Sequence, residues 1–138
     1  MRVVLDTNIL IGALITKGTP PDSLYQAWLR GMIELVTSTT QVSELADVLA
    51  RRRLRKFLDP DEAKSIVENI NTRALILDAL PSVFLSPDPK DNHILATAIS
   101  GDVDLIVSGD KRDMLALGEI ENIPIVTARE ALERLRNA

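Results

Sequence analysis

Short apolar runs alternate with longer amphipathic stretches along the chain. The runs are rich in β-branched residues, which is typical of strands buried in a parallel sheet. They predict strands at residues 3–5, 33–37, 83–85, 105–107 and 123–126. Between them, apolar positions repeat at helical spacing. In the helix expected after residue 38, the positions predicted to be buried are Val42, Leu45, Ala46 and Leu49. The alternation predicts an α/β domain with a mostly parallel sheet.

Turn-forming and capping residues mark the ends of the predicted helices. Residues 17–21 form a loop, and Asp22 or Ser23 is expected to cap a helix that stops at Gly31. Ser38 opens a capping box for the next helix. Further helices are expected at residues 9–15, from residues 59–62 onward, at residues 88–99 and after Thr127.

The composition narrows the class of protein. A chain of 138 residues with 46% hydrophobic residues suits one domain, spanning residues 1–138, with its own core. The absence of cysteine excludes disulfides, thiol catalysis and cysteine-ligated metal sites. No apolar run approaches the roughly 20 residues that span a membrane. An acid at position 6 argues against a signal peptide. We therefore expect a cytoplasmic protein that does not contact membranes.

The charge and the aromatic content argue against two modes of nucleic-acid binding. A binder that relies on electrostatics alone would be basic, whereas this chain has a net charge of −4 and a pI near 5.0. A nuclease that holds metal ions is still compatible with this charge, because bound cations offset carboxylates locally. Aromatic residues make up only 3% of the chain, so a platform for stacking bases is not expected.

Four acids are expected at the carboxyl ends of the predicted strands or in the helices that follow them. They are Asp6, Glu44, Asp91 and Asp110. In open α/β sheets, functional groups gather at this edge. Asp91 shares a helical face with Leu95 and Ala98, so it is expected to point along the buried stripe.

Clustered, buried carboxylates repel one another unless a cation lies among them. Oxygen ligands alone suit Mg²⁺ or Mn²⁺. The four acids therefore predict a magnesium or manganese site that activates water and clamps a phosphate, with one or two metal ions.

Each acid also has a purely structural explanation. Asp91 can complete a capping box opened by Asp88, and Glu44 can stabilise a helix N-terminus. Asp110 and Asp113 can be turn residues. Asp6 is harder to explain in this way, because it follows a buried strand directly. All these explanations would have to hold at once, so the joint pattern favours a functional site.

The sequence resembles the PIN-domain family over essentially its whole length. The matching segments are Val4-Leu5-Asp6-Thr7-Asn8, Ser43-Glu44-Leu45, residues 88–96 around Asp91, and Ser108-Gly109-Asp110. The resemblance implies a three-layer α/β/α sandwich with a mostly parallel central sheet. It also implies a ribonuclease that depends on Mg²⁺ or Mn²⁺.

The same resemblance implies roles for individual residues. The acidic metal-site residues would be Asp6, Glu44, Asp91 and Asp110, with Asp113 a further candidate. Asn8 would steady the site by hydrogen bonds, and Ser108 stands where the family often has Thr. Many small prokaryotic members resemble VapC-like toxins, which are usually dimeric and are silenced by an antitoxin. An antitoxin partner and a homodimer are therefore expected for an RNA-cleaving chain of this kind.

Three other features have more than one interpretation. The basic residues Arg51, Arg52, Arg53, Arg55 and Lys56 either contact RNA phosphates or form a solvated helix end. His93 follows Asp91 by two residues, which predicts a surface or cap role on the opposite side of the helix. Tyr25 and Trp28 are expected to pack in the core or at an interface.

Two rival functions fit part of the pattern. In a phosphohydrolase of the haloacid-dehalogenase type, Asp6 would be the nucleophile and Thr37 or Ser38 would bind the phosphate. Residues 109–113 would then be its last acidic motif. Asn8 occupies the place of the second Asp in that family, and Glu44 and Asp91 would have no role. The other rival is a non-catalytic domain that binds RNA or protein.

Overall fold

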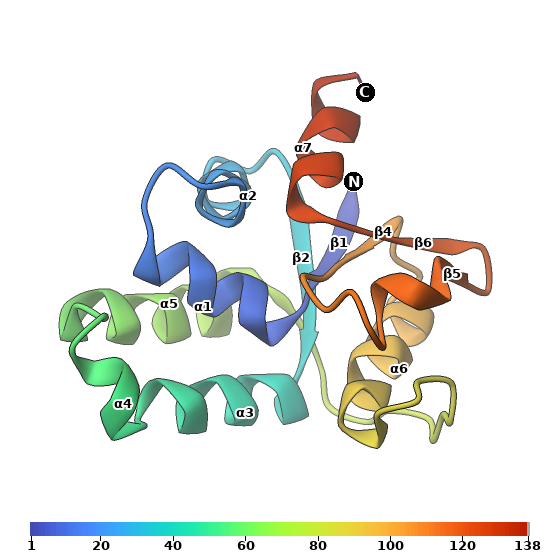
Figure 1. Cartoon of the computed structure of the whole chain (residues 1–138), viewed down its shortest axis with the longest axis horizontal. Helices are drawn as coiled ribbons and strands as arrows, with labels where there is room; N and C mark the ends of the chain where they lie inside the picture. The colour runs from blue at the N-terminus through green and yellow to red at the C-terminus, as the bar shows by residue number, and fades with distance from the viewer. Residues whose placement is uncertain (138) are drawn as a thin grey trace.

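The computed structural model describes residues 1–137 and contains one six-stranded sheet (Figure 1). The strands are β1 (Arg2–Leu5), β2 (Glu34–Ser38), β3 (Leu75–Leu77), β4 (Leu105–Val107), β5 (Glu119–Ile120) and β6 (Ile123–Val126). Their order across the sheet is β3-β2-β1-β4-β6-β5. All neighbours pair in parallel except β5, which is antiparallel to β6. The predicted mostly parallel sheet is confirmed.

Helices cover both faces of the sheet. They are α1 (Thr7–Ile15), α2 (Pro20–Leu29), α3 (Thr39–Leu49), α4 (Arg52–Arg55), α5 (Pro60–Arg73), α6 (Asn92–Ser100) and α7 (Ala128–Arg136). Two 3₁₀ turns, η1 (Pro89–Asp91) and η2 (Leu115–Leu117), complete the described part of the chain. Within residues 1–137, no helix combines the length and the apolar character needed to cross a membrane.

Alternate side chains of the central strand enter two different cores. Val3 and Leu5 of β1 pack with the helices α1, α2, α3, α5 and α7, whereas Val4 packs with α6 on the other face. The domain is therefore a three-layer α/β/α sandwich, as predicted. Tyr25 and Trp28 are buried in the larger core with their ring centroids 5.7 Å apart. Their predicted packing role is confirmed.

The strand predicted at residues 83–85 is wrong. This segment is coil, and the Phe84 side chain is 89% exposed. The third strand is instead β3, which follows α5 after a single residue and pairs with β2. A short apolar run that directly continues a helix has no periodicity of its own, so its sequence does not separate strand from helix.

Three helix details also differ from the predictions. Thr19, not Asp22 or Ser23, caps α2, and its hydroxyl accepts a hydrogen bond from the Asp22 amide at 3.5 Å. Ala46 of α3 is exposed, although Leu45 is fully buried. The helix predicted at residues 88–99 begins as the 3₁₀ turn η1 and becomes α-helical only in α6. The predicted Ser38 and Thr127 caps are confirmed.

The strand order places three loops at one edge of the sheet. Strand β1 lies between β2 and β4, so the residues that follow these three parallel strands meet at the carboxyl edge. Helix α6 packs against β1 and β2, and the chain reaches its first turn from β3. Four segments of the chain therefore converge at this edge.

A close approach between α6 and β2 makes Gly101 sensitive to substitution. A Cβ atom at Gly101 would lie 2.7 Å from Val36 Cγ1 and 3.1 Å from the Thr97 carbonyl oxygen. Val36 is fully buried and β-branched, so its side chain has little freedom to move away. We expect Gly101→Ala to lower the free energy of unfolding by about 1–3 kcal/mol in urea denaturation.

The matched control is Gly12→Ala in the interior of α1. There the nearest atoms to an added Cβ are Pro21 Cβ and Cγ, both at 3.8 Å. Alanine favours a helix over glycine by about 0.5–1 kcal/mol, so this variant should be more stable than the wild type. Destabilisation of both variants to the same degree would contradict the close approach of α6 to β2.

Candidate functional site

Asp6 is a buried carboxylate held by two loops. It follows β1 and caps α1, and the residue is only 7% exposed. Its Oδ1 accepts a hydrogen bond from the Thr7 amide at 2.8 Å. Its Oδ2 accepts one from the Ser108 hydroxyl, also at 2.8 Å. Both oxygens are thus oriented by groups at the ends of adjacent strands.

Burial dominates the ionisation of Asp6. Loss of solvation raises the pKa of this carboxyl above its usual range. The hydrogen bonds from the Ser108 hydroxyl and the Thr7 amide oppose this shift by lowering the pKa of Asp6. The charges of Glu44 and Asp110 add to it by raising the pKa. The Asp6 carboxylate therefore lies within electrostatic range of two of the other predicted site acids.

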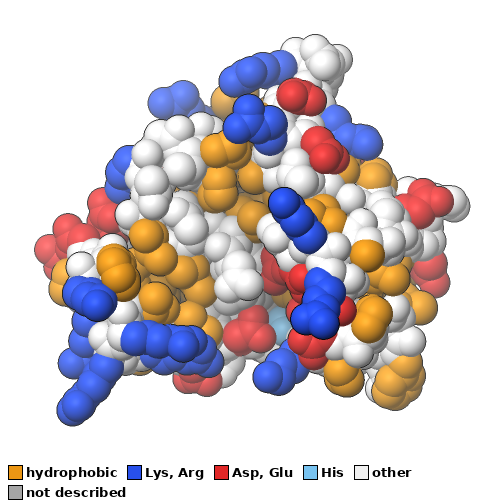
Figure 2. Space-filling view, viewed as in Figure 1, with side chains coloured by type: hydrophobic (Ala, Val, Ile, Leu, Met, Phe, Trp, Pro, Cys, Tyr) orange, Lys and Arg blue, Asp and Glu red, His pale blue; other side chains and the backbone are white. Residues whose placement is uncertain are grey.

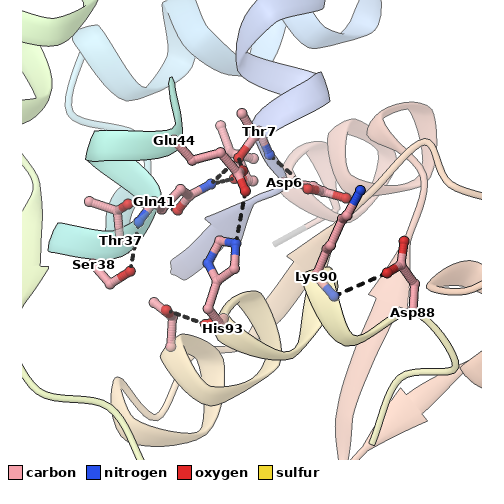
Figure 3. A network of polar contacts seen from close by, with 11 residues as sticks. Asp6, Thr7, Thr37, Ser38, Gln41, Glu44, Asp88, Lys90 and His93 are labelled. Atoms are coloured by element: carbon pink, nitrogen blue, oxygen red, sulfur yellow. Dashed lines mark hydrogen bonds and ion pairs between the residues drawn. The ribbon is translucent and has the colours of Figure 1, made fainter. Parts of the chain in front are cut away.

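Glu44 is fixed by a chain of polar contacts that begins in the sheet. The Thr37 hydroxyl donates to Gln41 Oε1 at 2.6 Å, and Gln41 Nε2 donates to the Leu5 carbonyl oxygen at 2.7 Å (Figure 3). Gln41 Nε2 also lies 3.4 Å from the Thr7 hydroxyl oxygen. The Thr7 hydroxyl in turn donates to Glu44 Oε1. This network ties the first turns of α1 and α3 together.

His93 contacts Glu44 directly, which corrects the predicted surface or cap role. His93 Nε2 lies 3.1 Å from Glu44 Oε2, and the His93 side chain is only 16% exposed (Figure 3). Since a carboxylate only accepts, Nε2 carries the proton of this hydrogen bond. The prediction failed because Asp91 lies in the 3₁₀ turn η1, so α-helical phase does not relate it to His93.

A second group of acids surrounds Asp91. Asp88, Asp91 and Asp113 each place one carboxylate oxygen within 4.8 Å of the others. Asp91 Oδ2 is buried and has no hydrogen-bond partner among residues 1–137. Burial, followed by the charges of Asp6, Asp88, Asp110 and Asp113, raises the pKa of Asp91 to about 6. The two groups of acids thus share one electrostatic environment.

Asp110 shapes the loop after β4. Its Oδ1 accepts hydrogen bonds from the Arg112 amide at 3.0 Å and the Asp113 amide at 3.2 Å. Its own amide donates to the Ser108 hydroxyl oxygen at 3.1 Å. Asp110 is therefore a turn residue whose charge also acts on Asp6 and Asp91.

Of the two residues predicted to support the site, the structure places only one among the acids. Ser108 lies inside the site, whereas Asn8 is exposed and its side chain has no hydrogen-bond partner in the described part of the chain. Thr7, Gln41 and Ser108 make the bonds that were expected of Asn8, because Asn8 lies two residues beyond the Asp6 cap of α1 and is exposed to solvent.

The basic run lies away from the acids. Residues 51–56 include the short helix α4 and follow the C-terminal end of α3 (Figure 1). The Ser38 cap lies at the other end of α3. Nearer the acids, three exposed cations stand in the same segments as the site carboxylates. They are Lys90, Lys111 and Arg112. In Figure 2, acidic side chains surround the only histidine in a central hollow, with Lys and Arg side chains around it and a separate basic group at the lower left.

Sequence reasoning missed several members of the site. Asp88 was treated only as a cap, although it both caps η1 and joins the acids around Asp91. Its spacing of three from Asp91 was a usable signal. Thr7, next to Asp6 in the segment Val4-Leu5-Asp6-Thr7-Asn8, has no role in the sequence-based prediction either. Gln41 had no signal beyond its place in a capping box, because its partners come from distant segments.

The phosphohydrolase interpretation loses its phosphate-binding hydroxyls. Thr37 and Ser38 are both fully or almost fully buried. The Thr37 hydroxyl donates to Gln41 Oε1, and the Ser38 hydroxyl oxygen accepts from the Gln41 amide at 3.1 Å. Both groups are committed to the fold and are inaccessible to a phosphate.

The donor set fits a hard divalent cation. Every acidic group at the site offers oxygen, which Mg²⁺ and Mn²⁺ prefer. The buried, unpartnered Asp91 Oδ2 is the kind of atom that a metal ion satisfies. Burial, followed by the charges of the neighbouring acids, raises the pKa of Asp91, and a cation here would stabilise its charged form against both effects.

Comparisons with known proteins give a consistent picture. A family model described as PIN domain matches residues 2–112. An uncharacterized protein of Methanocaldococcus jannaschii is 26% identical over 141 residues, which cover 96% of this chain and 90% of that protein.

Two solved structures share the fold. VapBC2 from Rickettsia felis, bound to a DNA fragment from its promoter, aligns with a TM-score of 0.57 at 18% identity, over 91% of this chain and 97% of the matched chain. FitAcB from Neisseria gonorrhoeae aligns with a TM-score of 0.53 at 14% identity, over 92% and 98%. At these identities the likeness concerns the fold.

The raised pKa of Asp91 predicts how stability depends on pH without metal. The folded protein holds this proton up to about pH 6, whereas the unfolded chain releases it near the ordinary aspartate pKa of 3.8. The free energy of unfolding should therefore fall as pH rises through this window. Asp91→Asn cannot ionise, so we expect it to melt at a higher temperature than the wild type above this window, in EDTA, and at a similar temperature below it.

Asp47→Asn provides the control for this measurement. Asp47 is exposed on α3 and has no side-chain hydrogen bond within residues 1–137. Its variant should follow the pH profile of the wild type. A stability gain in Asp91→Asn that stays the same at acid pH would contradict the assigned cause.

Proposed function

Because this chain belongs to the PIN domain family, we propose that it is a nuclease that hydrolyses RNA with the help of Mg²⁺ or Mn²⁺. PIN domains are generally nucleases, which supports a hydrolase that acts on nucleic acid. The observation that carries the proposal is Asp91 Oδ2, a buried carboxylate oxygen without a partner among surrounding acids. A structural carboxylate would have a donor there.

Carboxylates from several segments of the chain are the proposed metal ligands. Asp88, Asp91 and Asp113 have oxygens close enough to share one cation. The charge of Asp6 also acts on Asp91, since burial and then the Asp6 charge raise the pKa of Asp91. When bound, the metal supplies Lewis acidity and lowers the pKa of water. We assign the metal-site role to Asp6, Glu44, Asp91 and Asp110, as the family resemblance implies, and add Asp88 and Asp113 from the geometry.

The remaining residues keep the carboxylates in place. Ser108 and the Thr7 amide prevent the Asp6 carboxylate from rotating. Thr7 and His93 hold one Glu44 oxygen each, so Glu44 presents a fixed negative charge and acceptor sites. Such preorganised carboxylates position a water molecule and a phosphodiester without rearrangement during the reaction.

The exposed cations beside the acids are the proposed phosphate contacts. Lys90 lies in η1 between Asp88 and Asp91, and Lys111 and Arg112 lie between Asp110 and Asp113. None of the three has an ion-pair partner among residues 1–137. A phosphate held by the acidic site would place its neighbouring phosphates near these side chains.

We further propose that the chain is the toxin of a toxin–antitoxin pair, forms a homodimer and acts in the cytoplasm. The support is the fold shared with VapBC2 and FitAcB, together with a cysteine-free sequence that suits a reducing compartment. The test is co-expression with the product of the adjacent gene. A stable complex that no longer cleaves RNA supports the pairing, and full activity in the presence of that product contradicts it.

Cleavage of RNA should depend on the metal and on the acids that would hold it. With Mg²⁺ or Mn²⁺ the purified protein should cleave RNA, and EDTA should stop the reaction. Asp6→Asn and Asp91→Asn should each lower kcat/KM by about 100-fold or more, because each removes a charge that acts only with the metal. Circular dichroism should show that both variants remain folded.

Asp47→Asn is again the control and should keep full activity. Retained cleavage in Asp91→Asn would remove that residue from the catalytic site. A covalent phosphoenzyme at Asp6, formed from a small phosphoester without RNA cleavage, would favour the phosphohydrolase instead.

A further prediction separates the two groups of cations. We compare Lys90→Ala/Lys111→Ala/Arg112→Ala with Arg51→Ala/Arg52→Ala in the binding of a short RNA by the inactive Asp6→Asn protein. Each lost phosphate contact lowers the slope of log K against log salt by about 0.7 for a single strand. The triple variant should therefore lose slope, while the double variant should keep it. The reverse result would return the RNA path to residues 51–56.

A further inference from the structure

A cavity adjoins the acidic site. It has a volume of about 520 Å³ and lies between the first turn of α3, the first two turns of α6 and the coil at residues 80–86. This volume falls in the range of pockets that hold small organic ligands. The cavity does not belong to the acidic site, because none of the acids lines it.

One turn of the chain separates the cavity from the acids. Asp88 and Asp91 belong to the acidic group, whereas Pro89, Asn92 and His93 line the cavity. His93 therefore borders both, since its Nε2 contacts Glu44 and its side chain forms part of the cavity wall. A ligand whose phosphate sits among the acids would have the rest of its structure next to this cavity.

His93 is the only titratable side chain among the residues that line the cavity. Its apolar surfaces come from Leu80, Pro81, Val83, Phe84, Pro89 and Ala96. No Lys, Arg, Asp or Glu lines it, so the site suits a neutral and flat group. A phosphate would require a cation that the lining does not offer.

Several hydrogen-bonding groups at the cavity are uncommitted. The hydroxyls of Thr40 and Ser82 have no partner among residues 1–137. Asn92 Oδ1 accepts from the Leu85 amide at 3.1 Å and the Ser86 amide at 2.9 Å. The Asn92 side-chain NH₂ has no acceptor within the described residues, so it remains a donor. Apolar walls with a few free donors and acceptors are typical of a specific ligand site.

Phe84 is exposed on an anchored segment. It is the most exposed of the large apolar side chains within residues 1–137, at 89%. The next two residues, Leu85 and Ser86, are bonded to Asn92 at the start of α6. Phe84 lines the cavity and adjoins this anchored backbone, so its exposed ring is available to stack on a planar ligand.

We propose that this cavity binds one nucleobase of the RNA substrate, next to the phosphodiester held by the acids. The proposal rests on the proposed function. A nucleobase is the neutral, planar and hydrogen-bonding part of a nucleotide, and it lies within one nucleotide of the phosphate. The low aromatic content argued against an extended stacking platform, but a single base pocket needs only one exposed ring.

The test compares Phe84→Ala, Phe84→Trp and, as a matched control, Phe57→Ala. Phe57 is also exposed, but it lies beside Lys56 after α4 and away from the cavity. Cleavage is measured on short RNAs that differ in one base beside the cut. Phe84→Ala should raise KM by about 10-fold, with little change in kcat, and should flatten the base preference. Phe84→Trp should restore both, and Phe57→Ala should match the wild type.

A binding measurement keeps the proposal independent of cleavage. Free nucleosides, which lack phosphate, are titrated into the folded Asp6→Asn protein, and the amide signals of Ser82, Asn92 and Ala96 are followed by NMR. Shifts confined to these residues and lost in Phe84→Ala support the proposal, even if no RNA is cleaved and the proposed function fails.

Three results would each overturn the base pocket. Unchanged KM and base preference in Phe84→Ala, with an active wild type, overturn the base pocket and leave the nuclease in place. Absence of nucleoside shifts at millimolar concentration also overturns it. If Phe84→Ala abolishes a dimer or a protein complex without changing KM, the cavity is a protein contact and the proposal is wrong.

Discussion

Mutual repulsion among carboxylates is the constraint on which this structure depends. Asp6 is buried, Asp91 has a buried oxygen without a donor, and their charges act on one another. The charged form of each carboxyl group would be more stable in water, since burial raises the pKa of both. The three adjacent strands β2, β1 and β4 nevertheless end at one edge and bring the acids together. The hydrophobic cores on both faces of the sheet stabilise an arrangement that its charges oppose.

The fold resolves the repulsion in two different ways. Around Asp6 and Glu44 it supplies donors, so that Ser108, Thr7 and His93 each hold a carboxylate oxygen. These contacts join loops far apart in sequence and leave little freedom for rearrangement. Around Asp91, residues 1–137 supply no donor to the buried oxygen and add further acids. The first arrangement is that of a rigid scaffold, and the second is that of a site completed by a cation.

The sequence predicts those features that depend on local pattern. Asp6 follows an unmistakable buried strand, and the parallel sheet follows from the alternation of elements. The failed strand at residues 83–85 shows the limit, because an apolar triplet in a coil looks the same as one in a strand. His93 shows another limit, since the 3₁₀ turn before α6 breaks the helical phase. The Gln41 network depends on distant partners and was not predictable.

The most direct test of this account is to locate Mn²⁺ by anomalous diffraction in crystals of the protein grown with that ion. The account predicts an ion bound at Asp91 Oδ2, among the neighbouring acids Asp88 and Asp113. Such an ion would explain why this buried oxygen has no protein partner. An ion bound elsewhere on the surface, or no ion near Asp91 at millimolar Mn²⁺, would contradict the central claim.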